Sequence, residues 1–223
     1  MGAVDYKVAI GAWVRGRLAR NPQAYKIPSN DLDIFIVRDV LDEADCRKLV
    51  RLIDQDRIPS GLLSPSGDPE FRTSESCNLN PHNPVVETIE AKIHGVMGID
   101  PLLSETIQGQ RYAVGQQFKA HHDFFYVEAD YWPEMARTGG QRTWTAMIFL
   151  NEPDGGGETF FEKAGVRVTP RRGNMLTWNN LDEEGRPNLF SMHQGLPVTG
   201  GVKHIITKWY RERPWIESEV AVY

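Results

Sequence analysis

The chain has 223 residues, with 25 Lys and Arg against 30 Asp and Glu, so its formal charge at pH 7 is −5. This charge argues against a general nucleic-acid-binding protein, because such proteins carry a basic surface. An apolar content of 40% and a charged content of 25% are typical of an ordinary globular chain, for which one well-formed core is expected at this length.

The N-terminal segment carries charges at Asp5 and Lys7 and only a short apolar run, so it lacks the profile of a signal peptide or a membrane span. Two cysteines, Cys46 and Cys77, are too few for a disulfide framework and form no CxxC motif. We therefore predict a cytoplasmic protein with no membrane partner. The stretch WVRGRLARNP fits either a helix that caps a sheet or a contact with a partner.

Two helices are expected in the first half of the chain, after a strand at residues 32–37. The first begins after Asp42, whose side chain suits an N-cap, and its apolar residues recur at helical spacing. The second is bounded by Asn83 as N-cap, Pro84 at the first helical position and Gly98 as the stop.

From about residue 105 the pattern changes to short runs rich in aromatic and β-branched residues, separated by Gly, Pro and Asn. The runs are TIQGQRYAV, QFKAHHDFFYV, TWTAMIFLN, ETFFE, VRVTP, NMLTWNN, LFSMH and KHIITKWYRE. Many short strands with turn signals predict a closed or two-sheet β architecture, with the helices outside. The long interruption at residues 128–141 contains a helix-like patch, and we expect it to act as a lid.

A candidate metal site lies in KAHHDFFY. Successive side chains of a strand alternate in direction, so His121 and Asp123 share one face while His122 points away. A third ligand is expected from a later strand, where His193 is available. Two histidines and one carboxylate on one side of a metal are the arrangement of non-haem Fe(II) oxygenases.

The order of the surrounding motifs resembles the prolyl 4-hydroxylase branch of the Fe(II)- and 2-oxoglutarate-dependent dioxygenases. The similar segments run from residue 72 to residue 213: RTSESCNL, QGQRYAVGQQFKAHHDFF, GGQRTWTAMIFLN, GGGETFF, PRRGNMLTW and HQGLPVTGGVKHIITKWYRER. The resemblance implies a mainly β fold with supporting helices, a double-stranded β-helix of the jelly-roll, cupin-like kind. It also implies Fe(II), 2-oxoglutarate, O2 and ascorbate as reductant.

The resemblance assigns roles to individual residues. It implies that His121, Asp123 and His193 hold the catalytic iron, that Lys203 pairs with the far carboxylate of 2-oxoglutarate, and that Tyr112 hydrogen-bonds the same carboxylate. The family's substrate side matches Arg72, Ser74, Arg142 and Trp209. Glu158 and Thr159 fit a strand that enters the site, without an assigned role.

Two positions depart from the family pattern, and one agreement is informative. Phe118 stands where tyrosine is frequent, and His204 stands where tryptophan commonly follows the lysine, so the substrate is in doubt while iron and 2-oxoglutarate binding are not. By strand alternation His204 faces away from the site. Asp123 favours hydroxylation, since related halogenases lack this carboxylate.

We therefore expect one domain over residues 1–223, with an N-terminal strand and supporting helices in 1–104 and the catalytic double-stranded β-helix in 105–215. The expected reaction is hydroxylation of a C–H bond with release of succinate and CO2, on a prolyl residue in a peptide or protein. Two alternatives stay open: a hydroxylase of a free amino acid, small amine or other metabolite, and a non-catalytic cupin-like module that binds a small anion or sugar.

Overall fold

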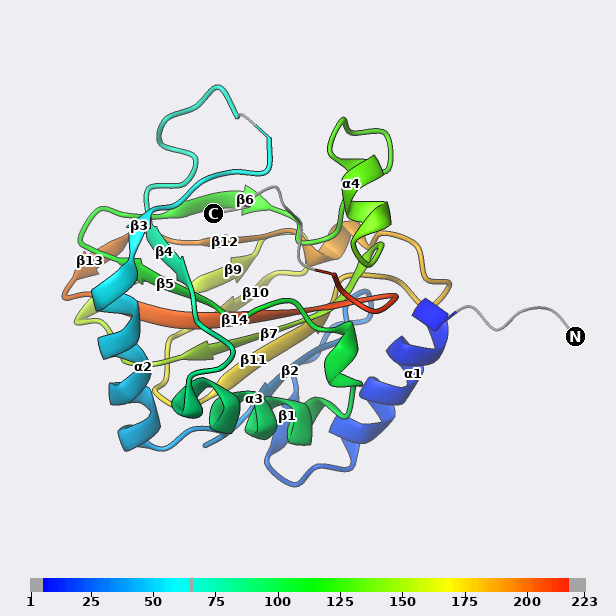
Figure 1. Cartoon of the computed structure of the whole chain (residues 1–223), viewed down its shortest axis with the longest axis horizontal. Coiled ribbons are helices and arrows are strands. Elements are labelled where there is room, and N and C mark those ends of the chain that lie inside the picture. The colour runs from blue at the N-terminus through cyan, green and yellow to red at the C-terminus, as the bar shows by residue number, and fades with distance from the viewer. Residues whose placement is uncertain (1–5, 65, 217–223) are drawn as a thin grey trace, which may run out of the picture.

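The structure is a computed structural model that describes residues 6–64 and 66–216, and it shows two opposed β-sheets with helices on the outer side of the larger one (Figure 1). The helices of the described residues are α1 (Tyr6–Ala19), α2 (Glu43–Asp56), α3 (Pro84–Met97), α4 (Trp132–Arg137) and the short 3-10 helices η1 (Pro101–Leu103) and η2 (Leu189–Ser191).

The larger sheet is antiparallel, with the strand order β1-β2-β11-β7-β14-β5-β4-β3. Its strands are β1 (Ala24–Lys26), β2 (Ile34–Val37), β3 (Ile58–Pro59), β4 (Glu75–Asn78), β5 (Gln108–Tyr112), β7 (Arg142–Phe149), β11 (Met175–Asn179) and β14 (Lys203–Arg211). The N-terminal half thus supplies β1 to β4 to this sheet, where the sequence predicted a single strand.

The smaller sheet has the order β10-β9-β12-β6 and is also antiparallel. Its strands are β6 (Phe118–His121), β9 (Thr159–Phe161), β10 (Val166–Val168) and β12 (His193–Gly195), and β8 (Gly155–Gly156) pairs separately with β13 (Val198–Gly200). This two-sheet architecture with supporting helices confirms the predicted fold class.

Strand alternation divides the apolar residues into two cores. On β7, Ala146 and Ile148 pack into a core shared with the helices, whereas Met147 and Phe149 pack into a second core between the two sheets. An interior strand covered on both faces needs apolar residues at nearly every position, and TWTAMIFL meets that requirement. The functional groups lie on the side that faces the smaller sheet.

The predicted helix boundaries in the first half are confirmed. The Asp42 side chain accepts a hydrogen bond from the backbone N–H of Asp45 at the start of α2, and Asn83 does the same for Val85 at the start of α3. Gly98 ends α3 with a φ of 67°, a left-handed conformation that glycine adopts without steric cost.

The N-terminal helix α1 packs Val14 and Leu18 into the helix-side core, so WVRGRLARNP belongs mostly to a helix that covers the larger sheet. In residues 6–64 and 66–216 we find no helix with both the length and the apolar character that a bilayer crossing requires.

Two strand predictions are wrong in part. The run LFSMH begins as the 3-10 helix η2, because Asn188 caps it by accepting the N–H of Phe190 and the Ser191 hydroxyl bonds back to the Asn188 carbonyl. The run QFKAHHDFFYV is a strand only as far as His121, so Asp123 follows the end of β6.

Candidate active site

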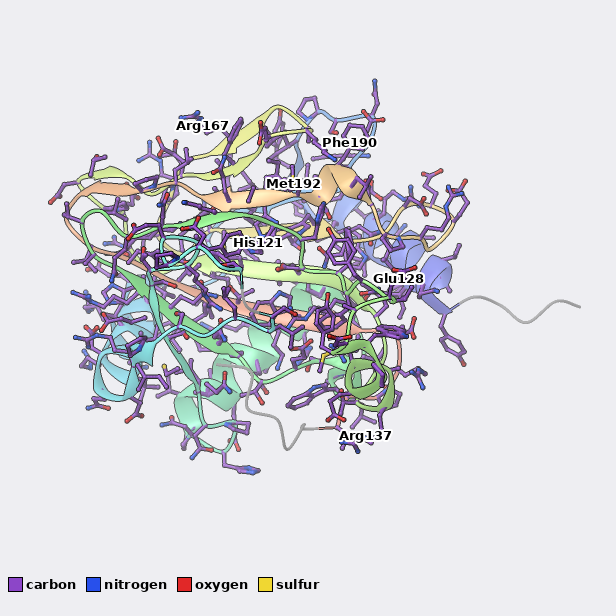
Figure 2. The ribbon with its side chains drawn as sticks, turned by 90° about the horizontal axis from the view of Figure 1, so that it is seen from above. His121, Glu128, Arg137, Arg167, Phe190 and Met192 are labelled. Carbon is purple, nitrogen blue, oxygen red and sulfur yellow. The ribbon has the colours of Figure 1, made fainter. Side chains whose placement is uncertain are left out.

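A cavity of about 860 Å³ lies between the two sheets, and residues of the β3–β4 segment and of the α4 segment line part of it. These two segments project from the same side of the molecule (Figure 1). One face of β14 supplies much of its wall, because every second residue of this strand points inward. These residues are Lys203, Ile205, Thr207, Trp209 and Arg211. From above, Glu128 and Arg137 lie to one side of His121, near the two ends of the α4 segment (Figure 2).

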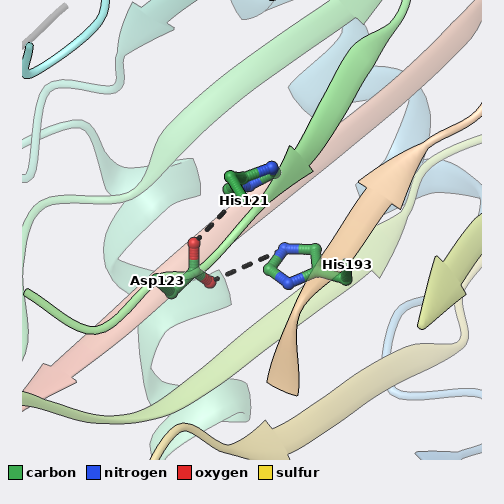
Figure 3. A group of neighbouring side chains, drawn as sticks. All are labelled: His121, Asp123 and His193. Carbon is green, nitrogen blue, oxygen red and sulfur yellow. Dashed lines mark ion pairs between the residues drawn. The ribbon is translucent and has the colours of Figure 1, made fainter. Parts of the chain in front are cut away.

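The structure brings His121, Asp123 and His193 together in this cavity (Figure 3). His121 ends β6, His193 begins β12, and the two residues are register partners in the smaller sheet. The Nε2 atom of His121 lies 3.8 Å from Asp123 Oδ1, and the Nε2 atom of His193 lies 4.0 Å from Asp123 Oδ2. The three ligand atoms are all within 4.8 Å of one another, so one cation can contact all of them.

Both imidazoles are oriented for metal binding by their other ring nitrogen. The Nδ1–H of His121 donates to the Lys119 carbonyl at 2.8 Å, and the Nδ1–H of His193 donates to the Ser191 carbonyl at 2.9 Å. This tautomer leaves each Nε2 lone pair free to coordinate. Burial, reinforced by the neighbouring His193, lowers the pKa of His121 to about 3, so the ring is neutral at physiological pH.

The Asp123 carboxylate is fixed from the floor of the cavity. The Thr145 hydroxyl donates to Asp123 Oδ2 at 2.8 Å, and Asn180 donates to the same hydroxyl at 2.9 Å. Burial acts to raise the pKa of Asp123, but His193, His121 and Arg142 together outweigh it, so the pKa lies below its ordinary value. The site therefore presents an ionised carboxylate beside two imidazole lone pairs, a donor set that suits Fe(II).

Lys203 lies deep in the cavity with only 2% of its surface exposed. Its Nζ lies 5.2 Å from the ring centre of Tyr112 and 5.8 Å from that of Phe149, and no hydrogen-bond or ion-pair partner meets it within the described residues. Burial lowers its pKa to about 8, against an opposing effect of the Glu158 charge. An ammonium without a counterion inside a cavity is suited to bind a carboxylate.

Thr159 adds a second candidate donor for the same carboxylate. Its hydroxyl is buried, lines the cavity and has no hydrogen-bond partner in the described part of the chain. The glycine turn before it makes room for the lysine: a Cβ on Gly157 would come within 3.1 Å of Lys203 Cδ. Tyr112 lies beneath Lys203, and its hydroxyl donates to the Gln110 side chain at 2.6 Å. Its predicted contact with 2-oxoglutarate stays a prediction.

The residues predicted for the substrate side lie at different depths. Arg142 lines the cavity between the rings of Trp209 and Phe125, at 4.1 Å and 4.9 Å from their centres. Arg72 lines the opposite wall and stacks at 4.7 Å on Phe118. Ser74 is buried behind Arg72, where its hydroxyl contacts Ser60 at 2.9 Å, and it does not line the cavity.

The two remaining histidines near the site have other partners. Nδ1 of His122 hydrogen-bonds with the Tyr126 hydroxyl at 2.9 Å on the outer side of the site. His204 faces the helices, as strand alternation predicts, and its Nε2 lies 3.1 Å from Asp54 of α2.

Sequence reasoning missed several residues of the wall. Glu105 accepts two hydrogen bonds from Arg142, from Nε and from Nη2, each at 2.7 Å, and a third from Arg211 at 3.1 Å. Arg211 also ties α4 to β14 through the Met135 carbonyl at 3.0 Å. The place of Arg211 in the wall could have been predicted, because alternation along the strand puts it on the same face as Lys203 and Trp209. No comparable signal marked Glu105, which lies in a loop.

Comparisons with known proteins agree with this geometry. The model of the 2OG-Fe(II) oxygenase superfamily, in which 2OG is 2-oxoglutarate, matches residues 107–211. A protein of Arabidopsis thaliana named probable prolyl 4-hydroxylase 8 is 30% identical over 79% of this chain and 67% of its own length, and prolyl 4-hydroxylase 2 of the same plant is 29% identical over 85% and 70%.

Among solved structures, the viral collagen prolyl hydroxylase of Paramecium bursaria Chlorella virus-1 in complex with 2OG is similar to this chain. The two share 26% sequence identity and a TM-score of 0.64 over 79% of this chain and 94% of the viral one.

Proposed function

The chain belongs to the prolyl 4-hydroxylase family of 2OG-Fe(II) oxygenases, and from this premise we propose that it hydroxylates a prolyl residue in a peptide or protein, with release of succinate and CO2. Its membership confirms the predicted enzyme class and the predicted Fe(II) and 2-oxoglutarate. The non-catalytic cupin-like alternative is not favoured by these relatives.

The observation that carries the proposal is the shared cavity of the His121, Asp123 and His193 group and the unpaired Lys203. Bound Fe(II) and 2-oxoglutarate supply the oxidative chemistry: one oxygen atom of O2 enters succinate and the other enters the C–H bond. The chain's own residues orient the cosubstrate and keep water out. Lys203 provides the charge and Thr159 the neutral donor for one end of a dicarboxylate, while the triad lies at the other.

The prolyl substrate is supported by the names of the relatives and by the form of the cavity. Its volume of about 860 Å³ lies in the range of small-molecule sites, and residues of two projecting segments, β3–β4 and α4, contribute to its lining. Aromatic rings and arginines line the cavity, among them Phe125, Tyr131, Trp215 and Arg142. Closure of the 128–141 segment, a requirement for ascorbate-like reductant and a cytoplasmic location stay predictions.

The test is mass spectrometry of proline-containing peptides after incubation with the protein, Fe(II), 2-oxoglutarate and O2. We expect a gain of one oxygen atom on proline, matched by an equal amount of succinate. Omission of Fe(II) should stop both products. Oxygen uptake with free proline or small amines, but with no peptide, would assign the enzyme to the small-metabolite alternative.

A further inference from the structure

The charges on the cavity wall do not balance. Among the described lining residues, the ionisable side chains that carry charge are Arg72, Arg142, Arg211, Lys203, Glu105 and Asp123. Four cations thus face two carboxylates. Because Fe(II) and the 2-oxoglutarate dianion cancel each other, the loaded cavity still holds two positive charges. Uncompensated charge in a site that excludes water is costly, so the wall is suited to a ligand that brings negative charge.

Three of these cations already have a partner or an assigned ligand. Arg142 makes a two-pronged contact with Glu105, and Arg211 donates to the same carboxylate. Lys203 faces the 2-oxoglutarate end of the cavity. Arg142 and Arg211 share the single Glu105 carboxylate, and this carboxylate holds both side chains in place.

Arg72 differs because all of its acceptors are neutral. Its guanidinium donates to the Gly61 carbonyl at 2.9 Å, to the Gln108 side chain at 2.9 Å and to the Ser74 hydroxyl at 3.4 Å. These contacts use three of its five N–H donors, and none of them reaches an anion. Burial is the largest cause that lowers the pKa of Arg72. The nearby Tyr112 and Asp123 oppose it, the charge of Arg142 adds to it, and the net direction is downward.

The position of Arg72 relates this charge to the reacting end of the cavity. Its guanidinium lies 4.7 Å from the centre of the Phe118 ring, and the His121 imidazole also stacks on that ring, at 3.6 Å with an interplanar angle of 14°. Arg72 is therefore separated from a metal ligand by a single aromatic ring. A substrate group bound by Arg72 thus lies near the His121 end of the cavity.

We propose, on the basis of the proposed function, that the substrate carries a carboxylate close to the target proline and that Arg72 binds it. An acidic side chain in a peptide meets the requirement. The neutral alternative is a backbone carbonyl that accepts a hydrogen bond from the same guanidinium. A charge-assisted hydrogen bond is about twice as strong as a neutral one, so the two alternatives differ in a measurable way.

The net charge of the chain makes the test more selective. At a formal charge of −5 the protein repels acidic peptides at long range, so a preference for them reports a local contact. The peptides are blocked at both ends, contain one proline and carry a single Glu moved through the two positions on either side of it. Each has a twin with Gln at the same place. Binding is measured by calorimetry to the anaerobic protein loaded with Fe(II) and 2-oxoglutarate, and hydroxylation by mass spectrometry.

We expect one Glu peptide to bind about tenfold more tightly than its Gln twin and to be hydroxylated with a higher kcat/KM. In Arg72→Gln the ratio should fall to about one, while the dissociation constant of 2-oxoglutarate stays the same because Lys203 is intact. Arg57→Gln is the matched control: it removes a partly buried arginine that pairs with Glu75 outside the cavity, and it should keep the tenfold ratio.

If the unaltered protein binds the Glu and Gln peptides of every pair equally well, the inference is overturned. If it still hydroxylates both peptides, the proposed function stands. A Glu preference that survives in Arg72→Gln would overturn the assignment to Arg72. Peptides that are not hydroxylated at all, by a protein that binds 2-oxoglutarate normally, would overturn the proposed function and this inference with it. The comparison of twins uses the unaltered protein, so it holds even if Arg72→Gln fails to fold.

Discussion

Two buried lysines on β14, five residues apart, show how the faces of the larger sheet differ. Lys208 faces the helices, and its ammonium donates to Glu90 of α3. Lys203 faces the cavity, and no acceptor in the described residues meets its Nζ. Both are about 2% exposed, and burial lowers both pKa values, although the Glu90 contact opposes this for Lys208. The helix-side lysine of this strand is satisfied by the fold, and the cavity-side lysine is left for a ligand.

Other groups on the same strand follow this division. On the cavity side the Trp209 Nε1 and Arg211 Nε atoms are buried without a hydrogen-bond partner among the described residues. On the helix side the Tyr210 hydroxyl lies 3.3 Å from Nδ1 of His94. His204 is a partial exception, because its Nδ1 atom is also unpartnered. Unsatisfied polar atoms that line a cavity are an expected property of a site that is completed by binding.

The largest effect that this comparison predicts is loss of a metal ligand. His193→Ala should abolish formation of both succinate and hydroxylated product, because removal of a ligand costs more than the 10- to 100-fold typical of the groups that orient it. The fold should survive, since most of the apolar core lies elsewhere, and circular dichroism should be unchanged. His94→Ala, on the helix side, is the control and should retain turnover. Unfolding of His193→Ala would instead indicate a structural metal.

The next effect concerns the cosubstrate. Lys203→Ala removes a charge-assisted contact worth about 1.5–3 kcal/mol, so the dissociation constant of 2-oxoglutarate should rise about 10- to 150-fold. Titration of 2-oxoglutarate into the anaerobic, Fe(II)-loaded protein measures it. Unchanged affinity would place the carboxylate site elsewhere in the cavity.

The pH dependence of the same binding gives a sharper test. In the free protein the Lys203 ammonium has a pKa of about 8, and a bound carboxylate raises that pKa. Below pH 8 the lysine is already charged, so affinity should be nearly constant. Above pH 8 binding must take up a proton, and the dissociation constant should rise about tenfold per pH unit until the pKa of the complex is reached. A titration series between pH 7 and pH 10 should show this slope in the unaltered protein and not in Lys203→Ala.

Much of this arrangement was predictable from local sequence. The caps of α2 and α3 and the alternation of the strands depend on rules that span a few residues. His121 and Asp123 do converge, but Asp123 follows the end of β6, so strand alternation is not the reason. His193 was available for the third ligand in a later part of the chain, and the family resemblance then assigned the roles of His193 and Lys203. The short N-terminal strands β1, β3 and β4 were not predicted, because their three-, two- and four-residue runs carry almost no pattern and depend on pairing with distant strands.

The partners of the buried charges could not be predicted either. The two lysines of KHIITKWYR cannot be told apart by their local sequence. Strand alternation places them on opposite faces, but it does not say which of them has an ion-pair partner. Glu90 is 118 residues from Lys208, and Glu105 reaches Arg142 and Arg211 from a loop. Such contacts between distant residues are set by the packing of whole elements, which no short window of sequence contains.

The smallest expected effect is on the helix side, and it completes the comparison of the two lysines. Lys208→Met keeps the aliphatic volume but leaves Glu90 without its cation. The free energy of unfolding should fall by about 1.5 kcal/mol, the lower end for a hydrogen bond to a charged group. The lower end applies because the Glu90 side chain is 22% exposed and regains contact with water. Urea denaturation measures this loss. The affinity for 2-oxoglutarate should not change.

Lys203→Met should do the reverse: it should keep or raise stability, because it removes a buried cation that has no partner, and it should weaken 2-oxoglutarate binding. Equal destabilisation by the two substitutions would mean that Lys203, too, is satisfied by the fold, and the contrast between the faces of β14 would be lost.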